Sequence, residues 1–143
     1  MAQRTKPRIK AEGVDRRLLV PVSWGELIDK ITILEIKAER IKRRDALANV
    51  RSELDALNAV VVQNAPRRAG IARLKSALRK INLALWEIED EIRLKERERA
   101  FDAAFIKLAR AVYQTNDRRA AVKREINQRL GSELVEEKHY ARY

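Results

Sequence analysis

Near its C-terminal end the chain places polar side chains inside an apolar helical stripe, and these are its best candidates for chemistry. Asn116 and Arg119 interrupt the stripe that Phe105 and Val112 begin. An unpartnered polar group inside such a stripe costs roughly 1–3 kcal/mol, and a charge costs more, so these side chains need partners. The candidate layer that would supply partners or bind a ligand is Glu35, Asn82, Trp86, Tyr113, Asn116 and Arg119.

This layer has two interpretations. The structural one is a polar layer that fixes helix register, with Arg119 paired to Glu35, Glu39 or another carboxylate. The functional one is a site in which Arg119 and Asn116 hold a small anion. We prefer the structural interpretation. An enzyme of the chorismate-mutase type would need inward-facing cations from several helices, whereas the inward cations here are Arg119 and Lys123, so the pattern does not favour an enzyme.

The layer depends on a helical hairpin. A short connection at 100–102 would make two helices antiparallel, so that residues whose numbers sum to about 201 lie level. Asn82 then lies opposite Arg119, and Trp86 opposite Thr115.

A second pair with catalytic chemistry, Asp29 and Lys30, lies in the apolar run Val20–Ile41. Helical geometry directs both side chains away from the main apolar stripe, toward solvent or toward a second contact face shared with Ile33 and Ile36. Those two isoleucines would need a cover, such as a dimer partner or the C-terminal tail. The stretch therefore predicts a helix start and a two-sided packing surface more than a catalytic site.

Metal and cofactor sites are not expected. The chain has no Cys and one His, His139, which excludes Cys-ligated zinc and multi-histidine sites. The stretch Trp86–Arg93 is rich in acids, but Arg93 and Lys95 lie at ion-pairing distance along a helix. We therefore expect ion pairs there and not a divalent cation.

The net charge of +11 is uneven. Residues 1–17 resemble a flexible basic arm, and a second basic block is Arg67, Arg68, Arg73, Lys75, Arg79 and Lys80. The block could bind a polyanion or form a solvated helix face. Aromatic residues are not interleaved with these bases, so nucleic-acid binding would be directed to the backbone and is not favoured.

Helical signals dominate the remaining chain. A capping box joins Ser23 and Glu26 at the start of the first helix, whose apolar stripe loses phase near 42–46, which predicts a kink or a stop and restart at Asp45. Heptad spacing from Ile71 to Ile92 predicts the second helix. Asp102 and Gly131 bound a third, at about 103–130.

The predicted fold is therefore all-α: an antiparallel up-down-up bundle of three long helices with coiled-coil-like packing, the first kinked near 42–46. We expect one domain over 18–143. No apolar run approaches the ~18 residues of a membrane span, and no secretory signal is visible, so we expect a cytoplasmic protein.

Four blocks resemble an uncharacterised bacterial family, a domain of unknown function: GELIDKITILEIK, INLALWEIEDEIR, FIKLARAVYQTNDRR and GSELVEEK. The resemblance implies an all-helical domain, often encoded near surface-polysaccharide glycosyltransferases, and it carries no catalytic residue or cofactor. The function that we expect is a helical module for protein–protein interaction or self-association. The alternatives are polyanion binding through the arm and the 67–80 block, and a small anionic ligand at the layer of Asn116 and Arg119.

Overall fold

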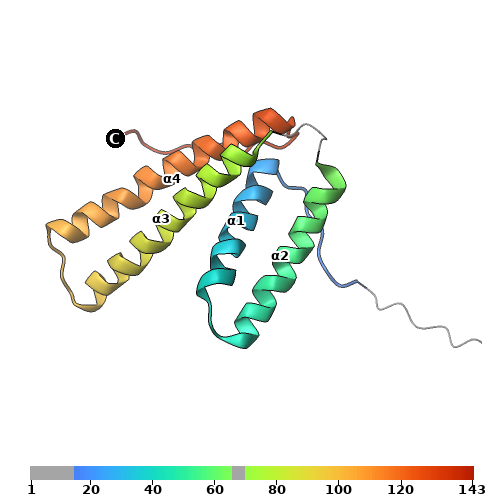
Figure 1. Ribbon diagram of the computed structural model, residues 1–143. Coiled ribbons are helices and arrows are strands. Elements are labelled where there is room, and N and C mark those ends of the chain that lie inside the picture. Colours follow the sequence, from blue (N-terminus) through green and yellow to red (C-terminus); the bar gives the residue numbers. More distant parts are fainter. Residues whose placement is uncertain (1–14, 66–69) are drawn as a thin grey trace, which may run out of the picture.

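The computed structural model describes residues 15–65 and 70–143. Within these ranges the chain forms four helices and no strands: α1 Trp24–Arg40, α2 Arg44–Asn64, α3 Ala72–Arg97 and α4 Ala103–Leu130. They make two hairpins, α1–α2 and α3–α4, and α1 contacts each of the other three helices (Figure 1). The all-α prediction is confirmed, and the predicted count of three helices is wrong. Most of the predicted basic arm, at 1–14, lies outside the described residues.

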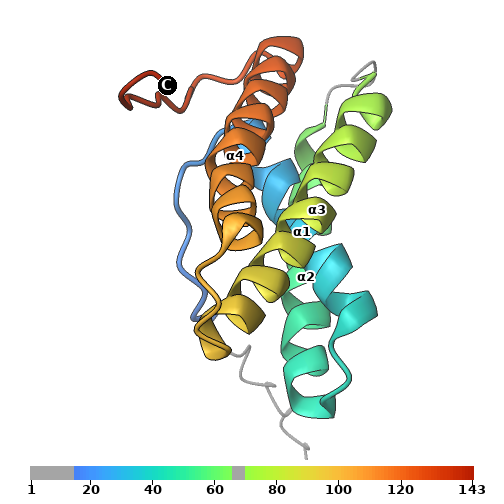
Figure 2. The same cartoon turned by 90° about the vertical axis from the view of Figure 1, so that its left-hand side faces the viewer.

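Of the two predicted alternatives near 42–46, a kink or a stop and restart, the structure shows the stop and restart. Helix α1 ends at Arg40, Ile41 is extended, and α2 begins at Arg44, with Asp45 inside its first turn and not at its cap. Neither Gly nor Pro lies between the two helices, so packing is the cause. If α1 and α2 formed one continuous helix, the apolar stripe of α2 would point away from the core. Because α2 instead folds back along α1, Leu54 and Leu57 pack against the core (Figure 2).

The hydrophobic core joins α1, α3 and α4. Helix α1 is buried on two sides, because Ile28, Thr32 and Ile36 form a second stripe at i, i+4 and i+8. The side chain of Ile36 is 1% exposed within one chain. Of the two covers expected for it, a dimer partner or the C-terminal tail, it needs no dimer partner. One cluster of buried residues forms the centre of this core: Leu27, Ile28, Ile31, Leu74, Leu78, Ile126 and Leu130.

Helix ends follow the predicted signals in most respects. Ser23 Oγ accepts from the backbone N–H of Glu26 at 3.1 Å, and Asp102 Oδ1 accepts from that of Phe105 at 3.0 Å. Gly131 ends α4 with a φ of 62°, the left-handed region that glycine adopts at low cost. The returning half of the capping box differs, because the Glu26 carboxylate accepts from Lys123 at 2.7 Å.

After Gly131 the chain reverses and runs back along α4 (Figures 1 and 2). We call residues 132–143 the tail; they form no helix or strand. Arg124 of α4 pairs with Glu137 at 3.0 Å, and the Tyr143 hydroxyl donates to Asp117 Oδ2 at 2.6 Å. These contacts follow the order expected of a segment antiparallel to α4. None of the described helices is long and apolar enough to cross a membrane.

Candidate functional site

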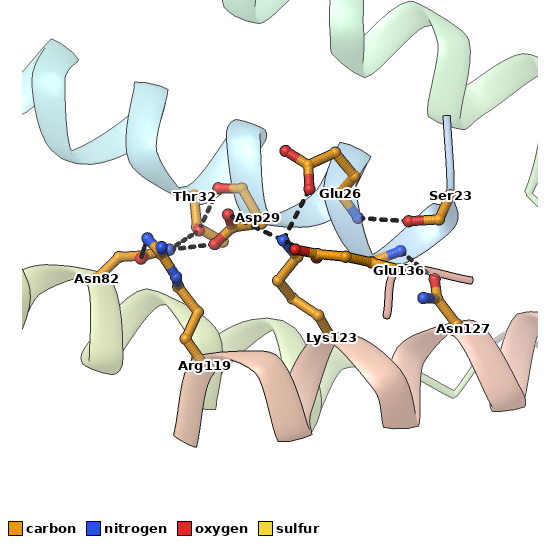
Figure 3. Close-up of polar contacts among 10 residues, drawn as sticks. Ser23, Glu26, Asp29, Thr32, Asn82, Arg119, Lys123, Asn127 and Glu136 are labelled. Carbon is orange, nitrogen blue, oxygen red and sulfur yellow. Dashed lines mark hydrogen bonds and ion pairs between the residues drawn. The ribbon is translucent and has the colours of Figure 1, made fainter. Parts of the chain in front are cut away.

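A buried polar network connects α1 to α3 (Figure 3). The amide nitrogen of Asn82 donates to Asp29 Oδ1 at 2.8 Å and to Thr32 Oγ1 at 2.9 Å. All three residues are buried. Because both acceptors lie on α1, they fix the amide of Asn82 in one orientation. Its carbonyl oxygen consequently faces α4.

Glycine at position 25 allows α4 to approach the start of α1. A Cβ atom there would lie 2.5 Å from the carbonyl oxygen of Lys123, closer than real side chains come. The backbone N–H of Gly25, which has no partner inside its own helix, donates instead to Asn127 Oδ1 at 2.6 Å. This close contact sets the distance between α1 and α4, and therefore the place of every α4 side chain in the network.

Lys123 connects α1, α4 and the tail. Its ammonium donates to Glu26 at 2.7 Å and to Glu136 at 2.8 Å, and it lies 3.9 Å from Asp29 Oδ2. Burial alone would lower the pKa of Lys123, but the carboxylates of Glu136 and Glu26 outweigh burial and the pKa is raised. The hydrogen bond from Lys123 in turn lowers the pKa of Glu136. The tail is thus held by a charged group that stays protonated.

Arg119 lies one helical turn from Lys123 and has no such partner. Its guanidinium donates to Asn82 Oδ1 at 3.4 Å, a long hydrogen bond, and it forms no ion pair with any residue that the structure describes. It lines a groove of about 410 Å³ together with Asn116 and the indole of Trp86. We call this the Arg119 groove. The Asn116 carboxamide oxygen is buried and, in the same described residues, accepts no hydrogen bond.

A second space lies between α4 and the tail and shares Asn116 and Arg119 with the groove. We call it the tail cavity; its volume is about 1000 Å³. The rings of Tyr113 and Tyr143 meet edge to face there, with centroids 4.9 Å apart. The hydrogen bond to Asp117 raises the pKa of Tyr143, which keeps that hydroxyl a donor. Two tail cations, Lys138 and Arg142, complete the lining.

The predicted register is confirmed, because Asn82 and Arg119 are hydrogen bonded across α3 and α4. Of the candidate layer, Asn82, Trp86, Asn116 and Arg119 line the groove, and Tyr113 lines the adjoining cavity.

Glu35 does not join them. It pairs with Lys75 at 2.7 Å and with Arg79 at 3.8 Å, and Glu39 pairs with Arg79 at 2.5 Å. The predicted partnership of Glu35 or Glu39 with Arg119 is wrong, because these acids face the N-terminal half of α3.

Those same contacts reduce the free charge of the predicted polyanion block. Lys75 and Arg79 are engaged with acids of α1, while Arg73 and Lys80 are exposed. Arg67 and Arg68 lie outside the described residues.

On α3, Arg93 pairs with Glu89 as predicted. Lys95 reaches Asp102 beyond the end of its helix at 2.9 Å and not an acid of its own helix. Within 15–65 and 70–143, no group of three or more acids or histidines could hold a metal ion.

Lys123 is buried, as its predicted inward position requires, whereas the sequence did not place the buried polar residues Asp29 and Asn127 in the site. Gly25 is the residue in the sequence that indicates a buried polar contact on this face. A glycine inside a predicted helix often marks a close approach of two backbones, and Asp29 lies one turn later on the same face. The second apolar stripe at Ile28 and Ile36 gave the same indication that this face is covered.

A family model described as a family of unknown function (DUF6165) matches residues 18–142, and the chain belongs to that family. No curated protein and no solved structure matches it.

Proposed function

We propose that this member of the DUF6165 family binds a small anionic molecule in the Arg119 groove, without a chemical step. The observation that carries the proposal is the guanidinium of Arg119, which lines an open groove and has no carboxylate partner in the described part of the chain. Lys123, one helical turn away on the same helix, contacts three acids. Arg119 forms no ion pair in the described part of the chain although Glu89 and Asp90 line the same groove, which fits a role toward a ligand.

The buried network supports the proposal because it orients Arg119. Asp29 fixes the amide of Asn82, and the carbonyl of Asn82 then accepts from one amino group of Arg119. The remaining donors of the guanidinium fork are available to an incoming anion. A fork held in this way suits a carboxylate or phosphate, which it can bind through two parallel hydrogen bonds.

Asn116 needs a hydrogen-bond donor, which an anion without N–H or O–H groups would not supply. Its buried carboxamide oxygen needs a donor, and an unsatisfied buried acceptor costs roughly 1–3 kcal/mol. A ligand that carries both an anionic group and an N–H or O–H donor would satisfy Arg119 and Asn116 together.

The other expected functions have weaker support. Self-association rests on the heptad spacing of α3 and on Ile33 and Ile36, but Ile36 is buried within the chain and Ile33 lines the groove. Polyanion binding was inferred from a basic block in which Lys75 and Arg79 are already paired. Within the proposal, the ligand would belong to the surface-polysaccharide setting that the sequence resemblance implies.

The experiment is isothermal titration of the full chain with pyrophosphate at about 0.15 M salt, where long-range charge effects are screened. We expect binding by the wild type and its loss in Arg119→Leu. Arg119→Lys should bind weakly, because a lysine keeps the charge and lacks the fork. Arg110→Leu is the matched control: it makes the same charge change on an exposed part of α4 outside both cavities. Equal affinity in Arg119→Leu and Arg110→Leu would refute the proposal.

A further inference from the structure

The tail cavity extends the Arg119 groove with a different chemistry. The groove carries Arg93 and Arg119 against Glu89 and Asp90, so its charges balance. The tail cavity carries the cations Arg119, Lys138 and Arg142 against one acid, Asp117. Asp117 is itself hydrogen bonded by Tyr143. An excess of two positive charges around one space suits a ligand with two anionic groups.

Three tyrosines line the same cavity as these cations. Tyr113 lies on α4, and Tyr140 and Tyr143 come from the tail, whose return along α4 brings them to the cavity. Tyr140 and Tyr143 are largely exposed and Tyr113 is 41% exposed, although a large aromatic side chain usually gains by burial. Open ring faces of this kind are surfaces on which a planar heterocycle stacks, and such stacking tolerates any base.

Asn116 lies between the two spaces, and its side chain needs a hydrogen-bond donor. It lines both the groove and the cavity, and its buried carboxamide oxygen has no partner among the described residues. Inorganic phosphate would satisfy the cations and leave the ring faces open. A ligand with a planar ring, two phosphates and hydroxyl or amide donors between them would use all three features.

We propose that the Arg119 groove and the tail cavity together bind a nucleoside diphosphate, with the ring against Tyr113 and the diphosphate between Arg119 and Arg142. This inference rests on the proposed function, because it assigns a ligand class to the same arginine. The tail is then part of the site: it supplies two of the three cations, Lys138 and Arg142, and two of the three tyrosines. Glu136 and Lys123 hold it at its base, at 2.8 Å.

The test compares dissociation constants of pyrophosphate, adenosine diphosphate and uridine diphosphate for the full chain at fixed ionic strength. We expect both nucleotides to bind at least about fivefold more tightly than pyrophosphate, the margin that the roughly 1 kcal/mol of one weakly stacked base supplies. Tyr113→Leu should abolish that margin and leave pyrophosphate binding intact. Arg142→Gln should weaken both nucleotides and pyrophosphate. Phe101→Leu is the control for ring removal, since Phe101 is exposed at the α3–α4 turn and outside the tail cavity.

Three results would overturn the inference. If pyrophosphate binds through Arg119 but the nucleotides bind no more tightly, the ligand class is wrong and the proposed function stands. If the nucleotide margin survives in Tyr113→Leu, the ring lies elsewhere and the tail cavity is not its site. If pyrophosphate and the nucleotides all fail to bind the wild type, both the inference and the proposed function are refuted. Far-UV circular dichroism of each variant separates loss of binding from loss of fold.

Discussion

Replacing Lys123 with Met tests whether the network that supports the site also stabilises the fold. Methionine keeps an unbranched apolar side chain of similar length and removes the ammonium. The three acids that contact Lys123 then lose their partner, but they are not equally affected. The side chains of Glu26 and Glu136 are half exposed and can return to water, whereas that of Asp29 is 7% exposed.

The expected loss of unfolding free energy in Lys123→Met comes mainly from Asp29. Removing one partner of a buried ion pair costs about 3–5 kcal/mol, because it leaves an uncompensated buried charge. Asp29 keeps its hydrogen bond from Asn82, so we expect the lower end of that range, about 3 kcal/mol. With a urea dependence of roughly 2 kcal/mol per molar, the unfolding midpoint would fall by about 1.5 M.

The assay is equilibrium urea unfolding at neutral pH, with Lys80→Met as the control, since Lys80 is an exposed lysine of α3. A second substitution, Asp29→Asn, should recover part of the loss in the Lys123→Met background, because it removes the unpaired charge. If Lys123→Met costs no more than Lys80→Met, the reasoning about the buried network is refuted. If Asp29→Asn lowers the stability of the Lys123→Met variant further, Asp29 is not the group that loses its partner.

Three further predictions concern the N-terminal end of α1 and the tail. Ser23→Ala should lower the unfolding free energy by about 0.5–2 kcal/mol through the lost cap, and an unchanged urea midpoint would contradict this. Gly25→Ala should destabilise by about 1–3 kcal/mol although alanine favours helices, because its Cβ would meet the Lys123 carbonyl at 2.5 Å; a stabilised variant would show that α4 does not lie so close. The lowered pKa of Glu136 means that its contribution to stability is present above about pH 4.5, its ordinary value, and is lost as pH falls through the lowered pKa. Acid titration of Glu136→Gln should therefore show a smaller loss of stability below pH 4.5 than the wild type, and identical acid limbs would argue against the Lys123 contact.

Local signals in the sequence predicted most helix boundaries. Ser23, Asp102 and Gly131 each act through their own backbone and the next turn, so their effect can be recognised without the fold. That Asn82 and Arg119 lie opposite each other could also be predicted, because a short connection between antiparallel helices leaves little freedom in their register.

Features that depend on how α1 packs could not be predicted in the same way. The break at Ile41 has no glycine or proline, and it forms because two stripes of different phase share one core. The partners of Glu35 and of Asp29 depend on the rotation of α1 about its axis, which the sequence pattern leaves open between two apolar faces. Rotation placed Glu35 beside Lys75 and Asp29 beside Asn82, and so left Arg119 without an acid.

Nuclear magnetic resonance of the two tryptophan indole N–H groups tests the central claim most directly. Trp86 lines the Arg119 groove, whereas Trp24 packs against the hydrophobic core and serves as an internal control. On titration with pyrophosphate we predict that the Trp86 signal shifts and saturates while the Trp24 signal stays in place, and that Arg119→Leu removes the shift. A Trp86 signal that does not move at saturating pyrophosphate, or that moves equally in Arg119→Leu, would contradict the assignment of the groove as an anion site.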